Sequence, residues 1–439
     1  MDVYKIKASA FIPCILSLNI LFFLRDFANI AVPSIVFLAI AVLIALFSDK
    51  TEVIAFCFCC IPVLNAFQSK YALWLCMIIY IVRFVKKPTI YAHFLPVFFL
   101  ILWEVLHKSA DFSFVEVIRL FTELSFCCFI GSLTGEDFDF DKTVRTMSFT
   151  AICACITILL SQLKGYGYSV TLLFSGVFRL GYGIDETRMS VGFNPNYLAY
   201  ICICCISGLV YIVYKKRQNV FDTLFIAMLS VFGLLTMSKK FVLCLLIMFV
   251  LFFLCWEGFE IKGKIKSLLL TIAIIIPVVF IMQRVFPTAY DALILRFGEN
   301  DISTGRNDIF AYYTEMLLSD PNLLMFGVGL QGYETKLLTN YNLSIPHNAF
   351  QELLVMWGIP GLVAFVAFLI LLMNRAHKLN HNIQFVNYIP LIIMLVNIQV
   401  SQMASSSVVT ILIAFVYMCL VTDMKTSADR ANTMPQSQE

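Results

Sequence analysis

The stretch "IPHNAFQELLVMWGIPGLVAFVAFLILLMN", residues 345–374, decides the class of fold, because a long apolar run follows a single His-Asn pair. A helix needs about 20 apolar residues to cross a hydrocarbon core of about 30 Å. The whole chain has the same character: of 439 residues, 60% are apolar and 13% are charged, with a mean hydropathy of +0.88. Soluble domains are roughly one-half apolar and one-quarter charged. The sequence therefore predicts an integral membrane protein.

Similar apolar runs recur from end to end and predict twelve to fourteen membrane helices. The candidate runs begin near Ala8, Ala28, Thr51, Tyr71, Thr89, Ser113, Val144, Gly192, Val220, Phe241, Ser267, Ala349, Phe385 and Ser405. The runs that begin at residues 51, 71 and 405 are short, which sets the lower bound of the range. A backbone in lipid must satisfy its own hydrogen bonds, so the expected fold class is all-α and polytopic.

Cysteine usage and net charge exclude some functions. All fifteen cysteines fall inside predicted spans, which favours a role as small apolar packing residues over metal or disulfide roles. The formal net charge of +3 is too small to imply a nucleic-acid partner.

Lysine and arginine crowd into alternate loops and predict the topology. These residues are Lys5, Lys7, Arg83, Lys86, Lys87, Lys142, Arg145, residues 215–217, Lys262, Lys264, Lys266, Arg375 and Lys378. The positive-inside rule makes their loops cytoplasmic. Both termini are then cytoplasmic, two long connections at 164–191 and 287–347 are extracytoplasmic, and the polar tail at 426–439 is expected to be disordered.

The connection at 287–347 has the pattern of an ordered loop. Its segment from Arg306 to Leu318 predicts an amphipathic helix at the membrane surface, with Ser303 or Thr304 as a cap. The apolar positions of that helix are Ile309, Tyr312, Tyr313, Met316 and Leu317. The glycines of FGVGLQG, residues 326–332, predict tight turns.

The end of this loop predicts a capped and then kinked helix. Asn348, with Gln351 three residues on, is typical of a capping box. GIPG, residues 358–361, predicts a break near Pro360, because proline removes a helical hydrogen bond.

His347 is the candidate general base, since a histidine takes a proton from a hydroxyl near neutral pH. Arg306 in the same loop and Arg188 in the other long loop are candidate phosphate ligands, because guanidinium forks match phosphate oxygens. Lys239 and Lys240 add outer cations against the charge bias of the chain. Taken singly, each is an ordinary surface side chain, but together they indicate an anionic, phosphate-bearing lipid substrate and a hydroxyl nucleophile.

Two acidic clusters have structural interpretations beside functional ones. Glu116, Arg119 and Glu123 share one face of an apolar run, which favours an ion pair between helices over a substrate site. The acidic stretch GEDFDFD, residues 135–141, is interpreted as a solvated cytoplasmic turn. No zinc spacing, phosphate-binding glycine loop or serine triad is present in the sequence.

The second half of the chain resembles the O-antigen polymerase and O-antigen ligase family of bacterial polysaccharide assembly. The resemblance is carried by RMSVGFNPNYLA (188–199), SKK (238–240), STGRNDIF (303–310), FGVGLQGYE (326–334) and IPHNAFQELLVMWGIPG (345–361). This chain departs from the family pattern at Lys239, where arginine is usual, and at Phe310, where tryptophan is frequent.

The resemblance implies a GT-C-like fold of many helices around an outward-facing cavity, in the bacterial inner membrane. It implies glycosyl transfer from undecaprenyl-diphosphate-linked oligosaccharide without a metal or other cofactor. It assigns catalysis to His347, Arg306 and Arg188. It assigns substrate binding to Lys239, Lys240, Asn348, Asn196 and Gly305. A chain-length regulator and a flippase of the same pathway are the implied protein partners.

Three functions follow as competing hypotheses. The favoured one is a polymerase of O-antigen or capsular polysaccharide that transfers glycan to a sugar hydroxyl of a lipid-linked repeat unit. The first alternative is an O-antigen ligase that transfers glycan to a lipid A core. The second is a flippase or transporter of lipid-linked oligosaccharide, which only the Glu116, Arg119 and Glu123 cluster favours.

Overall fold

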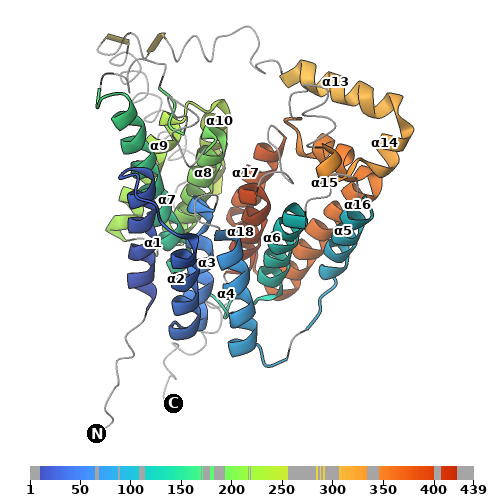
Figure 1. Ribbon diagram of the computed structural model, residues 1–439, viewed down its shortest axis with the longest axis horizontal. Coiled ribbons are helices and arrows are strands. Elements are labelled where there is room, and N and C mark those ends of the chain that lie inside the picture. The colour runs from blue at the N-terminus through green and yellow to red at the C-terminus, as the bar shows by residue number, and fades with distance from the viewer. Residues whose placement is uncertain are drawn as a thin grey trace, which may run out of the picture.

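The computed structural model describes residues 10–64, 69–87, 89–107, 114–169, 178–181, 193–215, 219–255, 306–333, 346–399 and 407–422, with a few single positions besides. Within these ranges every regular element is a helix (Figure 1). The predicted all-α, polytopic membrane fold is confirmed. In chain order the elements are α1 Phe11–Asp26, α2 Ser34–Phe47, α3 Lys50–Cys59, η1 Ile61–Val63, α4 Ser69–Phe84, α5 Phe94–Leu106, α6 Phe114–Ser132, α7 Phe140–Gly165, α8 Pro195–Tyr214, α9 Val220–Leu235, α10 Lys239–Cys255, α13 Arg306–Ser319, α14 Pro321–Phe326, α15 Gly329–Gly332, α16 Ala349–Leu379, η4 Phe385–Tyr388, α17 Ile389–Ile398 and α18 Ser407–Val421.

Three described helices, α7, α8 and α16, are long and apolar enough to cross a membrane, and shorter apolar helices lie beside them in the bundle (Figure 1). The predicted run near Ser267 and the tail at 426–439 lie outside the described residues. Most of the connection at 164–191 and about half of that at 287–347 lie outside them too. The count of twelve to fourteen crossings and the loop boundaries therefore stay predictions.

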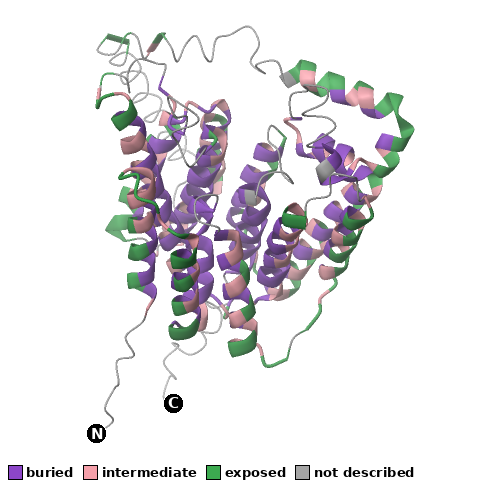
Figure 2. Ribbon diagram, in the orientation of Figure 1, coloured by how far each residue is buried: buried purple, intermediate pink, exposed green. Residues whose placement is uncertain are grey.

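Two of the three shortest predicted runs, those that begin at residues 51 and 405, form the interior of the bundle. Every residue of α18 from Val408 to Val421 is buried, as is the stretch from Glu52 to Cys59 of α3 (Figure 2). A helix that is apolar all round lies in a protein core or spans a membrane, and the burial of these two helices places them in the core. These two helices contact other helices, so their length does not have to match the thickness of a bilayer.

The cysteines belong to this interior. All fifteen are free thiols, and thirteen of them are buried. Among the described residues no group of three His, Cys, Asp or Glu side chains could hold a metal ion. Packing is thus the role that the structure gives the cysteines.

One end of the bundle is tied together by ion pairs that cross between helices. Lys142 Nζ of α7 lies 2.8 Å from Glu52 Oε1 of α3. Arg145 of α7 donates from Nε and NH2 to the two carboxylate oxygens of Asp222 in α9, at 2.8 Å each. Both acidic partners also belong to capping boxes at their helix starts. We call this the basic end; it also carries Lys50, Lys86, Lys87, Lys215 and Arg375.

The acidic stretch 135–141 lies at the basic end and is more than a solvated turn, so that prediction needs correction. Lys50 Nζ lies 3.4 Å from Asp137 Oδ1, and Arg217 NH2 lies 3.2 Å from Asp141 Oδ1. The turn thereby joins the starts of α3 and α7 to the segment that follows α8, because Asp137 and Asp141 each meet a cation from another part of the chain.

The charged cluster predicted at Glu116, Arg119 and Glu123 lies in α6. Arg119 Nε lies 2.6 Å from Glu116 Oε2, and Arg119 NH1 lies 3.4 Å from Glu123 Oε1. These ion pairs are within one helix, at spacings of three and four residues, and the predicted pair between helices stays a prediction. Arg119 and Glu123 are buried, which is the environment in which a charged side chain needs such a partner.

Candidate functional site

The start of α16 is fixed by Asn348, as the sequence predicts. The Asn348 side chain accepts hydrogen bonds from the backbone N–H of Phe350 at 3.0 Å and of Gln351 at 3.2 Å. His347, half-buried, directly precedes this cap. The cap leaves His347 at a helix N-terminus, where the helix dipole gives a positive potential. Glu352, fully buried in the first turn, offsets part of that potential.

Gln351 does not complete the predicted capping box. Its Nε2 donates instead to the Phe310 carbonyl oxygen at 2.8 Å and to Thr314 Oγ1 at 2.9 Å, both in α13. The first turn of α16 is therefore joined to the first turns of α13. Arg306 opens α13 one turn before Phe310, a rise of about 6 Å. The predicted helix at 306–318 is confirmed, and of its apolar face Tyr313 and Leu317 are buried, whereas Tyr312 is exposed.

A second set of amide contacts continues from Asn348 to the starts of α8 and α10. Asn348 Nδ2 donates to the carbonyl and side-chain oxygens of Gln399, at 3.4 and 3.3 Å. Two residues earlier, Asn397 Nδ2 donates to Cys244 Sγ in α10, at 3.1 Å. Cys244 lies one turn after the buried Lys240. Asparagine and glutamine thus connect α16, α17 and α10.

The starts of α8 and α10 meet directly. Ser238 Oγ donates to Asn196 Oδ1 at 3.0 Å, and Lys239 and Lys240 follow Ser238 in the chain. Together with Asn348, Gln351 and Gln399, these contacts form one polar arc at the end of the bundle opposite the basic end (Figure 1). We call it the amide end.

The glycine turn beside α13 packs into a break in α16. Gly358 has φ +64° and ψ −166°, two residues before Pro360, so the break lies slightly earlier than predicted. A Cβ on Gly358 would lie 2.5 Å from Met325 O, and one on Gly327 would lie 2.3 Å from Met356 O. Only glycine allows the two backbones to approach this closely at such a φ.

Groups from α5 and the glycine turn satisfy the polar atoms that this break exposes. Val328 N–H donates to the freed Val355 carbonyl at 3.0 Å, and Trp103 Nε1 donates to the Trp357 carbonyl at 3.0 Å. The buried Glu104 carboxylate accepts from Trp357 Nε1 at 2.7 Å and from Leu330 N–H at 3.1 and 3.0 Å. The segment from 326 to 332 is therefore held rigidly against α16.

The structure brings most, but not all, of the predicted site residues to one end of the molecule. Asn196, Lys239, Lys240, His347 and Asn348 lie at the amide end, with Asn196, Lys240 and Asn348 in or next to its contacts. The backbone of Arg306 lies there too, and its side chain is outside what the structure describes. Arg188 and Gly305 also lie outside the described residues.

Several residues at the amide end were missed by the sequence reasoning. Gln351 was assigned only to the cap, and Asn397, Gln399 and Glu104 were not singled out. The available signal was a polar side chain inside an apolar run, which is costly in a membrane and usually paired or functional. Glu104 in FLILWEVL is the clearest instance.

The amide end has the chemistry for an anionic substrate with a reacting hydroxyl group. It combines two lysines, a histidine at a helix N-terminus and amide groups that can donate to or accept from sugar hydroxyls. Three of its helix starts, those of α8, α10 and α16, direct backbone N–H groups toward the same end.

Comparison with known proteins finds a family to which part of the chain is similar. Residues 223–366 match the model of the family described as O-antigen ligase, about a third of the chain. The match begins in α9 and ends in α16, so it includes α10, α13 to α15 and His347, and it leaves out Arg188 and Asn196. Among curated proteins no similar sequence is found. The chain is thus a multi-pass membrane protein whose residues 223–366 are similar to the O-antigen ligase family, and this similarity supports an enzyme of the ligase or polymerase type.

Proposed function

We propose that this protein is a polymerase of O-antigen or capsular polysaccharide. It transfers glycan from an undecaprenyl-diphosphate donor to a sugar hydroxyl of a lipid-linked repeat unit. The observation that carries the proposal is the hydrogen bonding of Gln351 to Phe310 and Thr314, which joins the helix after His347 to the helix that Arg306 opens. His347, the proposed base, directly precedes α16, and Arg306, the proposed phosphate-binding residue, opens α13. Their positions beside neighbouring helix turns suit a single reacting centre.

In this reaction the acceptor hydroxyl oxygen attacks the anomeric carbon of the donor sugar. The bond from that carbon to the diphosphate oxygen breaks, and its electron pair leaves with the diphosphate. His347 takes the hydroxyl proton as general base. Arg306 and Arg188 bind the departing diphosphate, whose charge they stabilise as preorganised donors without a metal.

The remaining residues hold the two substrates. Lys239 and Lys240 supply positive charge for the donor diphosphate. Gly305, which has no side chain, lets the protein backbone approach that diphosphate closely. Asn348 and Asn196 belong to the polar arc, where their amides orient sugar hydroxyls. The partner proteins of this proposal are a chain-length regulator and a flippase that delivers the lipid-linked units.

The polymerase is distinguished from its alternatives by the surface polysaccharide of a deletion strain. Loss of a polymerase leaves single repeat units at the surface, whereas loss of a ligase leaves full-length polymer on its lipid carrier. Loss of a flippase leaves neither at the surface. Gel electrophoresis of the surface and lipid-linked fractions decides among them, and full-length polymer on the lipid carrier would make the protein a ligase.

The side of the membrane is tested separately. We propose that the amide end is extracytoplasmic, because the other end carries the basic loops. Asp308 is exposed on α13, and an Asp308→Cys variant should react with an impermeant maleimide added outside. Since thirteen of the native cysteines are buried, the background is low. Labelling only from the cytoplasm would reverse the proposed topology.

A further inference from the structure

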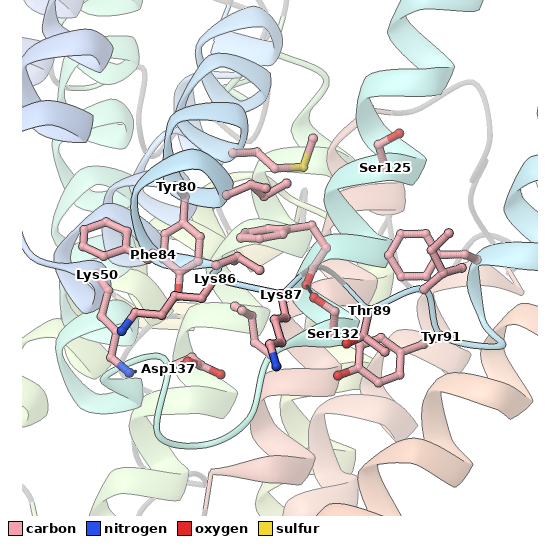
Figure 3. Close-up of a pocket in the computed structure, with 17 residues that line it drawn as sticks. Lys50, Tyr80, Phe84, Lys86, Lys87, Thr89, Tyr91, Ser125, Ser132 and Asp137 are labelled. Carbon is pink, nitrogen blue, oxygen red and sulfur yellow. Dashed lines mark hydrogen bonds and ion pairs between the residues drawn. The ribbon is translucent and has the colours of Figure 1, made fainter.

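A cavity of about 450 Å³ opens at the basic end, between α4, the start of α5 and the end of α6 (Figure 3). It is at the opposite end of the bundle from the amide end. Its wall includes Tyr80 and Phe84 of α4, Phe94 of α5, and Phe129 of α6. The cavity therefore has a largely aromatic and aliphatic wall.

The rim of the cavity is positively charged. Lys50, Lys86 and Lys87 line it, and among the described lining residues Asp137 is the single carboxylate. Lys50 lies 3.4 Å from that carboxylate, so Asp137 is already matched by one cation. Lys86 and Lys87 are exposed and make no ion pair or hydrogen bond with any residue in the described ranges. Two ammonium groups thus remain at the rim for an anion from outside the chain.

The depth of the cavity runs along the bundle. Ser132 and Ser125 of α6 both line it, and their separation of seven residues is a rise of about 10 Å. Figure 3 shows Ser125 higher on α6 and Lys87 beside Ser132, near the loop. The charged rim is therefore at the end of the bundle, and the apolar wall extends from it along α6 toward the middle of the bundle. Ile90, 76% exposed at the mouth, continues the apolar surface outward.

We propose that this cavity binds one anionic phospholipid from the leaflet at the basic end. Its phosphate accepts hydrogen bonds from Lys86 and Lys87, and the upper part of an acyl chain lies against Phe84 and Phe129. Basic pockets between membrane helices suit anionic head groups in this way, and lysine stems can lie along apolar surface while their ends reach the phosphate. A soluble anion would use the lysines and leave the aromatic wall empty.

The test uses the purified full-length protein in a neutral detergent, titrated with phosphatidylglycerol or with phosphatidylcholine. Bound lipid is counted by native mass spectrometry. We expect one phosphatidylglycerol to bind with clear preference over phosphatidylcholine. The Lys86→Gln/Lys87→Gln variant should bind it about 25-fold more weakly, at roughly fivefold for each lysine. These lysines are exposed, so the variant should fold normally.

The control variant is Lys215→Gln/Lys378→Gln, which removes the same charge from half-buried Lys215 and exposed Lys378 elsewhere at the basic end. It should keep wild-type affinity for phosphatidylglycerol. An equal loss in both variants would mean diffuse attraction to the basic end and would overturn the proposal, as would wild-type affinity in the Lys86→Gln/Lys87→Gln variant. Displacement of the lipid by millimolar inorganic phosphate alone would reassign the cavity to a soluble anion.

Discussion

At the basic end of the bundle, ion pairs connect the starts of α3, α7 and α9, whereas at the amide end neutral amides connect α16 with α13 and α17. Lys142 with Glu52 and Arg145 with Asp222 are ionic ties between helix starts. Gln351 and Asn348 make the corresponding connections at the other end. In an ion pair each charge is neutralised by its partner. An amide carries no net charge, so the positive potential of nearby cations and helix N-termini still acts on a ligand. The comparison separates an end built for stability from an end built for binding.

The largest effect is expected from His347→Ala, which removes the proposed base from the amide end. A positioned base contributes about 10²–10⁴-fold in rate, roughly 3–5 kcal/mol of barrier. Turnover of purified lipid-linked substrate should fall by that factor, while thermal stability stays near wild type. The matched control is His381→Ala, since His381 is exposed beyond the other end of α16; its turnover should not change.

His347→Gln separates catalysis from anchoring. Glutamine keeps hydrogen bonding but is not a useful base, so turnover should stay low. If this variant recovers full activity with purified substrate, His347 only anchors the loop and the proposed mechanism is wrong.

The second-largest effect is expected at Glu104, because this carboxylate holds the glycine turn, residues 326–332, in the break of α16. Glu104→Ala leaves the N–H groups of Leu330 and Trp357 buried without their acceptor, at about 1–3 kcal/mol for each donor. The unfolding temperature in detergent should fall markedly. Glu315→Ala, an exposed acidic residue on α13, should leave it unchanged. Equal unfolding temperatures for the two variants would show that the carboxylate does not hold the turn.

The extent to which the sequence predicts these features depends on how local their causes are. The long helices α7, α8 and α16 follow from run length and hydropathy, and the Asn348 cap follows from an asparagine placed directly before such a run. The burial of α3 and α18 could not be predicted, because it depends on which other helices surround a short apolar run. Length alone made these two runs doubtful spans.

The candidate site, like the fold, can be predicted from the sequence only where the cause is local. The sequence predicts the residue types of the amide end, since histidine, lysine and asparagine stand out in apolar surroundings. It does not predict their partners. Glu104 reaches Trp357 across 253 positions, and Gln351 bonds to α13 instead of to its own cap. Such contacts depend on how distant helices pack, which no local pattern encodes.

The third prediction tests the basic end. Arg145→Gln removes the bidentate partner of Asp222, whose side chain is fully buried, and the uncompensated carboxylate should lower the free energy of unfolding by about 1–3 kcal/mol. Turnover per folded molecule should be unchanged, because the ionic ties act on stability. Lys378→Gln, an exposed charge at the same end, is the control. A loss of turnover at wild-type stability would erase the distinction between the two ends.

The smallest effect is expected from Gln351→Ala, and it tests whether an amide tie positions the site. The variant loses the hydrogen bonds to Phe310 and Thr314, at about 0.5–1.5 kcal/mol each. Because these bonds join α13 to α16, their loss should loosen Arg306 relative to His347 and raise KM for the lipid-linked donor.

The matched control for Gln351→Ala is Asn380→Ala at the basic end. Asn380 is a buried amide that donates to Leu420 O at 2.8 Å and accepts from Asn382 N–H at 3.1 Å, so its loss should cost similar stability. Its donor KM should stay at the wild-type value, because it touches neither α13 nor the start of α16. Steady-state kinetics and thermal unfolding of both variants give the comparison. If the two lose stability alike and neither changes KM, Gln351 is a packing residue, and the connection of α13 to α16 does not position the donor.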